Sequence, residues 1–218
     1  RGLLKKSIAP VGKCRLCCFL YISNKIHLKG NDFQSFEVSQ LYSTYVKLFN
    51  QIQGNPIFRT RIRKIYGRYF YWSWAKWIGK KKILSPYIAP LDLVVKEAFP
   101  SSVQNYIFGL EDFSEMGFLM HFLRKDDFFV DIGANIGAYS LLAAGVSEAF
   151  VLSFEPDDAR RDFLKEQVMV NGLHPLIYID SRVVGTKEET LIFSEHSVSK
   201  NIYVEAGVPR IAVSIDSL

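Results

Sequence analysis

The sequence of 218 residues is poor in cysteine, and its 3 cysteines, Cys14, Cys17 and Cys18, all lie near its start. The rest of the chain therefore has no means of forming an internal disulfide, which fits a reducing compartment. The spacing Cys14-x-x-Cys17 is that of half a zinc site. No second Cys or His pair follows at the spacing of a zinc finger, so we predict no metal site.

Long hydrophobic runs are also missing. The run from Cys17 to Ile22 is much shorter than the roughly 20 apolar residues that cross a bilayer, and no small-residue cleavage site follows it. We predict neither a transmembrane helix nor a signal peptide, and we expect a cytoplasmic protein. The first methionine is Met116, so we expect this sequence to be part of a longer chain.

Acidic residues are scarce at the start. Residues 1–90 contain 17 Lys and Arg against Asp32 and Glu37, whereas residues 91–218 contain 10 Lys and Arg against 20 Asp and Glu. This asymmetry predicts a basic, aromatic-rich extension over residues 1–90. A globular domain then occupies residues 91–218, with its core starting at about residue 105. A basic extension attracts anionic partners, although a solvated segment without a partner explains it equally well.

Aromatic and basic residues alternate over residues 57–82, which predicts a helix rich in Tyr and Trp. Three interpretations remain open. The helix packs on the globular domain, lies on an anionic membrane surface, or stacks against single-stranded nucleic acid. We favour packing, keep peripheral membrane contact as the alternative, and consider nucleic acid the least favoured partner.

The remaining pattern predicts an α/β fold. Residues 83–110 contain Pro86, Pro90 and Pro100, which favours short strands and turns, with a strand over residues 105–110. A helix capped by Asp112 or Ser114 follows. We expect further helices over residues 36–49, 136–144 and 159–170, and strands over residues 128–132, 150–154, 176–179, 190–193 and 211–215. Their alternation implies a parallel sheet with helices on both faces.

The loop after the first parallel strand predicts a ligand site, because ligands bind such sheets beyond the carboxyl ends of the strands. Gly133 and Gly137 permit a tight turn and a close approach of the ligand, and Asn135 tolerates the left-handed conformation that such turns need. Asp131 ends the first strand. Glu155 follows it by 24 residues and ends the second, where its carboxylate can accept hydrogen bonds from both ribose hydroxyls.

A nicotinamide or flavin dinucleotide binds to the same topology as S-adenosylmethionine, and the sequence of the glycine loop distinguishes the two ligands. A dinucleotide loop has the spacing G-x-G-x-x-G against a pyrophosphate, whereas this loop reads Gly133-x-Asn135-x-Gly137 after Asp131, a carboxylate that repels phosphate. S-adenosylmethionine carries no phosphate and presents an ammonium and a sulfonium. The residues therefore favour S-adenosylmethionine over a dinucleotide and over a glycine turn without a ligand.

Three segments resemble the FkbM-type methyltransferases: residues 109–119, residues 129–140 and Phe154-Glu155-Pro156. The resemblance covers about residues 107–218. It implies a Rossmann-like class I methyltransferase that depends on S-adenosylmethionine and methylates a hydroxyl of a small molecule, a sugar or glycan, or a natural product. The cofactor-binding residues implied by the motifs are Asp131, Gly133, Ala134, Asn135, Gly137, Glu155 and Pro156.

In that family a Lys-Ile-Asp-Val-Glu-Gly-like strand follows the segment that residues 211–218 resemble. We therefore expect a C-terminally truncated enzyme with an incomplete sheet, inactive by itself. No catalytic base is evident, since the four histidines show no grouping and His196 is only the least implausible candidate. The alternative function is a catalytically degenerate module that binds S-adenosylmethionine or associates with a membrane or nucleic acid.

Overall fold

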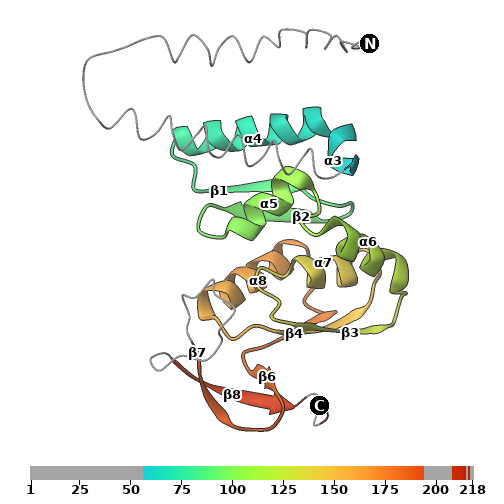
Figure 1. Cartoon of the computed structure of the whole chain (residues 1–218), viewed down its shortest axis with the longest axis vertical. Helices are drawn as coiled ribbons and strands as arrows, with labels where there is room; N and C mark the ends of the chain where they lie inside the picture. The colour runs from blue at the N-terminus through green and yellow to red at the C-terminus, as the bar shows by residue number, and fades with distance from the viewer. Residues whose placement is uncertain (1–55, 194–207, 215, 217–218) are drawn as a thin grey trace, which may run out of the picture. The chain divides into compact units, whose positions relative to one another are not determined.

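The computed structural model describes residues 56–193, 208–214 and 216, all of which fall in one unit of the chain (Figure 1). The predicted helix over residues 36–49, the three cysteines and His196 lie outside the described residues. Within the described residues, no helix is both long and apolar enough to cross a membrane.

The aromatic and basic segment is helical, as predicted, and it packs on the residues that follow it. Its two helices are α3 (Pro56–Thr60) and α4 (Ile62–Trp77). The apolar face of α4 buries Ile65, Trp72 and Ala75, and this helix contacts the helix α5 (Pro100–Phe108). Packing is therefore the interpretation that the structure supports for this segment.

An antiparallel hairpin follows, formed by β1 (Lys82–Pro86) and β2 (Asp92–Lys96). Its strands pair from Lys82 opposite Lys96 to Pro86 opposite Asp92, so the predicted division after residue 90 falls in the loop of this hairpin. The hairpin also contacts the later part of the chain, because Gln167 of the helix α8 (Asp158–Val170) forms two hydrogen bonds with the backbone of Val94.

The strand predicted over residues 105–110 is wrong, since these residues end the helix α5 (Pro100–Phe108). Pro100 occupies the first helical turn, where its missing N–H costs nothing. The helix then buries Ser102, Asn105 and Tyr106, which share one face. Gly109, with a φ of 92°, ends it.

The next helix, α6 (Phe113–Phe122), begins after Asp112 and buries Met116 and Leu119. The predicted capping is wrong, because no side chain caps its amino terminus. The Asp112 carboxylate instead accepts a hydrogen bond from the hydroxyl of Tyr139.

The centre of the described part is a parallel sheet in which strands and helices alternate, as the sequence predicts. Its order is β3-β4-β5. The elements are β3 (Phe128–Ile132), α7 (Ala138–Gly145), β4 (Phe150–Phe154), α8 (Asp158–Val170) and β5 (Ile177–Asp180). The predicted strands lie within one residue of the observed ones. Asp157 caps α8 as its carboxylate accepts from the backbone N–H of Arg160 at 2.9 Å.

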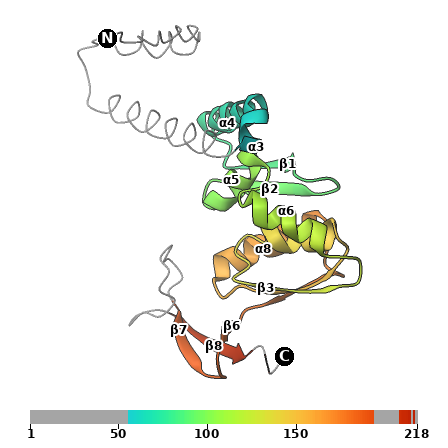
Figure 2. The same cartoon turned by 45° about the vertical axis from the view of Figure 1, so that its right-hand side comes forward.

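The helices α7 and α8 pack on one side of this sheet, as Figures 1 and 2 show. The opposite side presents Phe128, Ile132, Phe150 and Tyr178, which are 66%, 52%, 44% and 69% exposed. The described residues thus cover one face of the sheet, where the sequence predicts helices on both.

A small separate sheet follows, with β8 (Val208–Ser214) between β6 (Val183–Gly185) and β7 (Thr190–Phe193). These strands confirm the predictions over residues 190–193 and, in large part, 211–215. Arg210 of β8 donates from Nε to the backbone oxygen of Pro156 at 2.9 Å. This contact ties the small sheet to the carboxyl end of β4.

Candidate functional site

The loop between β3 and α7 has the backbone that the sequence predicts. Gly133, Asn135 and Gly137 all have positive φ angles, of 76°, 53° and 83°. Such angles are accessible to glycine and tolerated by asparagine, so these residue types make the turn. A Cβ on Gly137 would lie 2.1 Å from Cδ1 of Leu164, whereas one on Gly133 would meet nothing within 4 Å. Gly137 therefore allows Leu164 to pack closely against the loop, and Gly133 leaves space for a ligand to approach the backbone.

Glu155 fastens this loop to the end of β4. Its Oε2 accepts from the backbone N–H of Asn135 at 2.7 Å, and its Oε1 accepts from that of Asp157 at 2.9 Å. The residue is 3% exposed, and burial raises the pKa of its carboxyl although these two hydrogen bonds oppose the shift. Each oxygen retains a second acceptor site. The sequence thus places Glu155 correctly at the loop, and its contact with a ribose stays a prediction.

Asp131 lies on the covered side of the sheet. Its Oδ2 accepts from Oγ of Ser140 at 2.5 Å, and that hydroxyl lies 2.8 Å from Oγ of Ser153. Burial raises the pKa of Asp131 above its ordinary value, although the hydrogen bonds from Ser140 oppose the shift. The carboxylate therefore ties β3 to α7 and β4. Its attraction for an ammonium group stays a prediction.

The remaining predicted cofactor-binding residues include Ala134 and Pro156, which lie at the same edge of the sheet. Ala134 is buried, and its N–H and that of Gly133 both donate to the backbone oxygen of Phe154 at 2.9 Å. The backbone oxygen of Pro156 accepts from Arg161 at 3.2 Å, in addition to Arg210. All seven predicted residues thus lie at the carboxyl ends of β3 and β4.

A carboxylate that the sequence analysis missed ends the third strand. Asp180 of β5 pairs with Phe154 in the sheet, and its backbone oxygen accepts from the N–H of Glu155 at 3.0 Å. Burial alone would raise the pKa of its carboxyl, but hydrogen bonds from Arg182, one of them 2.6 Å long, hold it below the ordinary value. The rule that selected Glu155, a carboxylate at a strand end, would also have found Asp180.

A second polar group that the sequence analysis left without a role borders the loop. The side chain of Asn135 donates to Oγ of Ser101 at 3.3 Å, which links the loop to α5. One turn further along α5, Asn105 donates to Oε2 of Glu111 at 3.1 Å and accepts from the hydroxyl of Tyr87 at 2.8 Å. The helix α5 therefore connects the glycine loop with the segment before α6.

Glu111 is the unusual member of this group. Burial raises the pKa of its carboxyl to about 7, and the charge of Asp112 contributes to the shift. Asp112 in turn accepts from the hydroxyl of Tyr139 at 3.1 Å, in the first turn of α7. A carboxyl group that changes charge near neutral pH therefore lies on the segment that touches the amino end of α7. Among the described residues, no group of three metal-ligating side chains occurs.

No protein-family model and no curated protein matches the chain, so the FkbM resemblance is not confirmed. The chain is similar in part to solved structures. A putative rRNA methylase from Clostridium thermocellum is 14% identical with a TM-score of 0.31, over 32% of this chain and 39% of that one. A putative transferase from Pyrococcus horikoshii is 19% identical with a TM-score of 0.38, over 54% and 48%. TYW2 of P. horikoshii in complex with MeSAdo is 19% identical with a TM-score of 0.39, over 59% and 50%. The chain spans half or less of the length of each.

Proposed function

We propose that this chain carries the cofactor-binding part of a class I methyltransferase that uses S-adenosylmethionine. The observation that carries the proposal is the left-handed loop of Gly133, Asn135 and Gly137, held by Glu155 at the carboxyl edge of a parallel sheet. This edge is where α/β sheets bind their ligands.

The chemistry of the edge suits this cofactor better than a dinucleotide. Asp131, Glu155 and Asp180 lie at or within one residue of the carboxyl ends of the three parallel strands, and within the described residues only Asp180 has an ion-pair partner, Arg182. The edge therefore carries carboxyl groups where a pyrophosphate would need cations or N–H donors. S-adenosylmethionine supplies an electrophilic methyl group on a sulfonium, and it carries no phosphate. Exposed Gly133 leaves room for the cofactor against the backbone, and the second acceptor sites of Glu155 suit its ribose.

The acceptor that we propose is a hydroxyl group on a sugar, a glycan or a natural product, as the FkbM resemblance implies. Methyl transfer to a hydroxyl needs a base that takes up its proton. Glu111 is linked to the glycine loop through Asn105 and Ser101 of α5, and its pKa, raised by burial to about 7, suits this task. A catalytically degenerate module that only binds the cofactor is the competing function. The two differ in whether methyl groups reach a hydroxyl acceptor.

The cleanest test of cofactor binding compares two glycines. Asp131→Ala and Glu155→Ala would weaken binding, but each also removes a buried structural contact. Gly133→Ala and Gly172→Ala instead impose similar strain, since their φ angles are 76° and 65° and neither new Cβ meets an atom within 4 Å. Only the first alters the loop.

We expect Gly133→Ala to weaken S-adenosylmethionine binding by at least about tenfold in calorimetry, because its methyl group enters the space of the ligand. Gly172→Ala, with an equal loss of stability, should leave the affinity unchanged. Equal affinities in both variants, or no binding by the unmodified protein, would overturn the proposal. For the acceptor step, measured on the full-length protein, Glu111→Gln should lower the rate of methyl transfer to a hydroxyl while cofactor affinity stays the same.

A further inference from the structure

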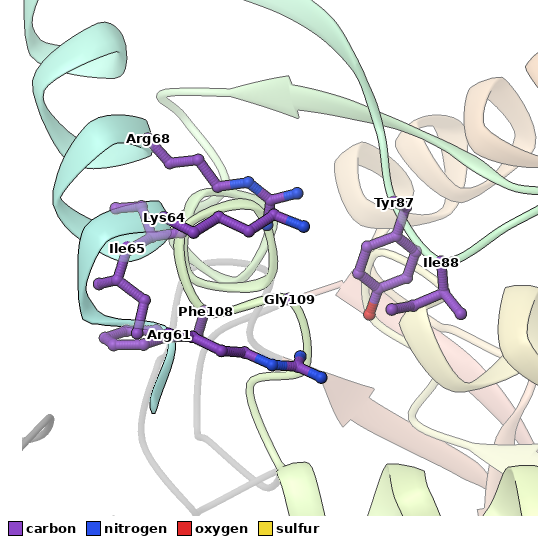
Figure 3. Close-up of a pocket in the computed structure, with 9 residues that line it drawn as sticks. Arg61, Lys64, Ile65, Arg68, Tyr87, Ile88, Phe108 and Gly109 are labelled. Carbon is purple, nitrogen blue, oxygen red and sulfur yellow. The ribbon is translucent and has the colours of Figure 1, made fainter. Parts of the chain in front are cut away.

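A small cavity of about 30 Å³ lies between α4 and the residues after β1, lined on one side by basic side chains. Arg61, which directly precedes α4, and Lys64 and Arg68 of α4 extend in one direction, toward Tyr87 (Figure 3). Gly109, after the end of α5, forms another part of the wall. None of the lining residues belongs to the glycine loop, so the cavity is distinct from the proposed cofactor site.

The three basic residues are close enough to repel one another. They follow the spacing i, i+3 and i+7, which places them on one face of the helix. Nη1 of Arg61 and Nη1 of Arg68 both lie 4.0 Å from the position that a Cβ on Gly109 would take. Burial lowers the pKa of Arg68, and the charge of Arg61 lowers it further although Tyr106 opposes the shift. The three positive charges therefore repel one another, and this repulsion is unfavourable for the folded protein in the absence of an anion.

Within the described residues, no carboxylate forms an ion pair with any of these three side chains. The fold does provide such partners for nearby lysines. Lys82 and Lys96 share Glu166, and Lys76 pairs with Glu97 at 2.5 Å. Lys76, Lys82 and Lys96 thus have carboxylate partners, whereas the three basic residues of the cavity have none within the described part of the chain.

The geometry favours an anion with several oxygen atoms. Arg68 donates from Nη1 to the backbone oxygen of Tyr106 at 2.6 Å, which fixes its guanidinium. Within the described residues, neither the guanidinium of Arg61 nor the ammonium of Lys64 donates a hydrogen bond to the protein, so both can face a ligand. Guanidinium groups recognise phosphate through paired N–H donors, and a lysine adds a point charge. Gly109 keeps the space in front of both guanidinium groups free of a side chain.

We propose that the cavity lined by Arg61, Lys64 and Arg68 binds a phosphate group. The group belongs either to a soluble phosphorylated molecule or to the headgroup of a lipid. The lipid source is worth testing because Trp74 and Trp77 on the same helix are 50% and 83% exposed. Such aromatic side chains suit a membrane surface.

The test uses a double variant, Arg61→Gln with Lys64→Gln, which leaves the packed Arg68 intact. The matched control is Arg63→Gln with Lys81→Gln. It removes the same charge from exposed residues that do not line the cavity. Thermal melts of both variants check that they fold. Calorimetry at constant ionic strength then measures inorganic phosphate and glycerol phosphate, and flotation measures vesicles of phosphatidylcholine with phosphatidic acid.

We expect the cavity variant to lose at least about tenfold in affinity for phosphate or for the vesicles, and the control to stay within twofold of the unmodified protein. Loss for the soluble phosphates alone assigns a soluble ligand, and loss for the vesicles identifies the headgroup. Equal losses in both variants would show only a general charge effect and overturn the proposal. It would also fail if neither the soluble phosphates nor the vesicles bound to the unmodified protein.

Discussion

Gly137→Ala tests whether the glycine loop is shaped by packing between α7 and α8. Gly137 directly precedes α7 as its N-cap residue with a φ of 83°, and a Cβ there would lie 2.1 Å from Cδ1 of Leu164, which is 0% exposed. The left-handed backbone costs an L-residue about 1–2 kcal/mol. Overpacking a buried site adds about 1–3 kcal/mol. The expected loss is therefore roughly 2–5 kcal/mol, a large share of the roughly 5–15 kcal/mol that holds a domain folded.

Gly172→Ala separates the two contributions. Gly172 has a φ of 65°, and a Cβ there would meet nothing within 4 Å, so its substitution shows the backbone strain without the clash. The same exchange also changes the entropy of the unfolded chain, and this effect cancels between the two variants. The difference between them should be the overpacking cost, about 1–3 kcal/mol.

Urea denaturation followed by circular dichroism measures both free energies of unfolding. In a Leu164→Ala background the difference between the two glycine variants should vanish, because the methyl group that the new Cβ meets is gone. A difference below about 0.5 kcal/mol in the unmodified background, the scatter of surface substitutions, would refute the reasoning.

Two further predictions concern buried polar groups. The pKa of Glu111 is raised from 4.5 to about 7, so the folded state holds this proton more tightly than the unfolded state. Its contribution to stability is present below pH 4.5 and is lost as the pH rises to about 7. The loss is roughly 1–2 kcal/mol after allowance for partial exposure. Glu111→Gln should flatten this part of the stability profile against pH, and an unchanged slope would contradict the assignment. Gln167 is 0% exposed and bonds both the N–H and the oxygen of Val94, at 2.9 and 2.8 Å. Gln167→Leu should cost roughly 2–4 kcal/mol in urea denaturation by leaving both backbone groups unpaired, and a neutral effect would show that they find other partners.

The sequence predicts correctly those features of the fold that depend on neighbouring residues, namely strand positions and backbone angles. The strands over residues 128–132 and 150–154 lie where their continuous apolar runs place them. The left-handed angles of Gly133, Asn135 and Gly137 follow from which residue types tolerate a positive φ. The helix α5 was missed because its sequence resembles a strand at short range. Pro100 at its start and a buried face against distant residues make it a helix instead.

The sequence by itself determined the alternation of strands and helices, the position of the glycine loop and the carboxylates at the strand ends. These features depend on neighbouring residues, apolar spacing and the conformations open to each backbone. Only the tertiary structure decided how those carboxylates are used. It turned Asp131 toward Ser140, fastened Glu155 to the loop and gathered basic side chains of α4 opposite Gly109. Such contacts join residues far apart in the chain, so their partners follow from how whole elements pack.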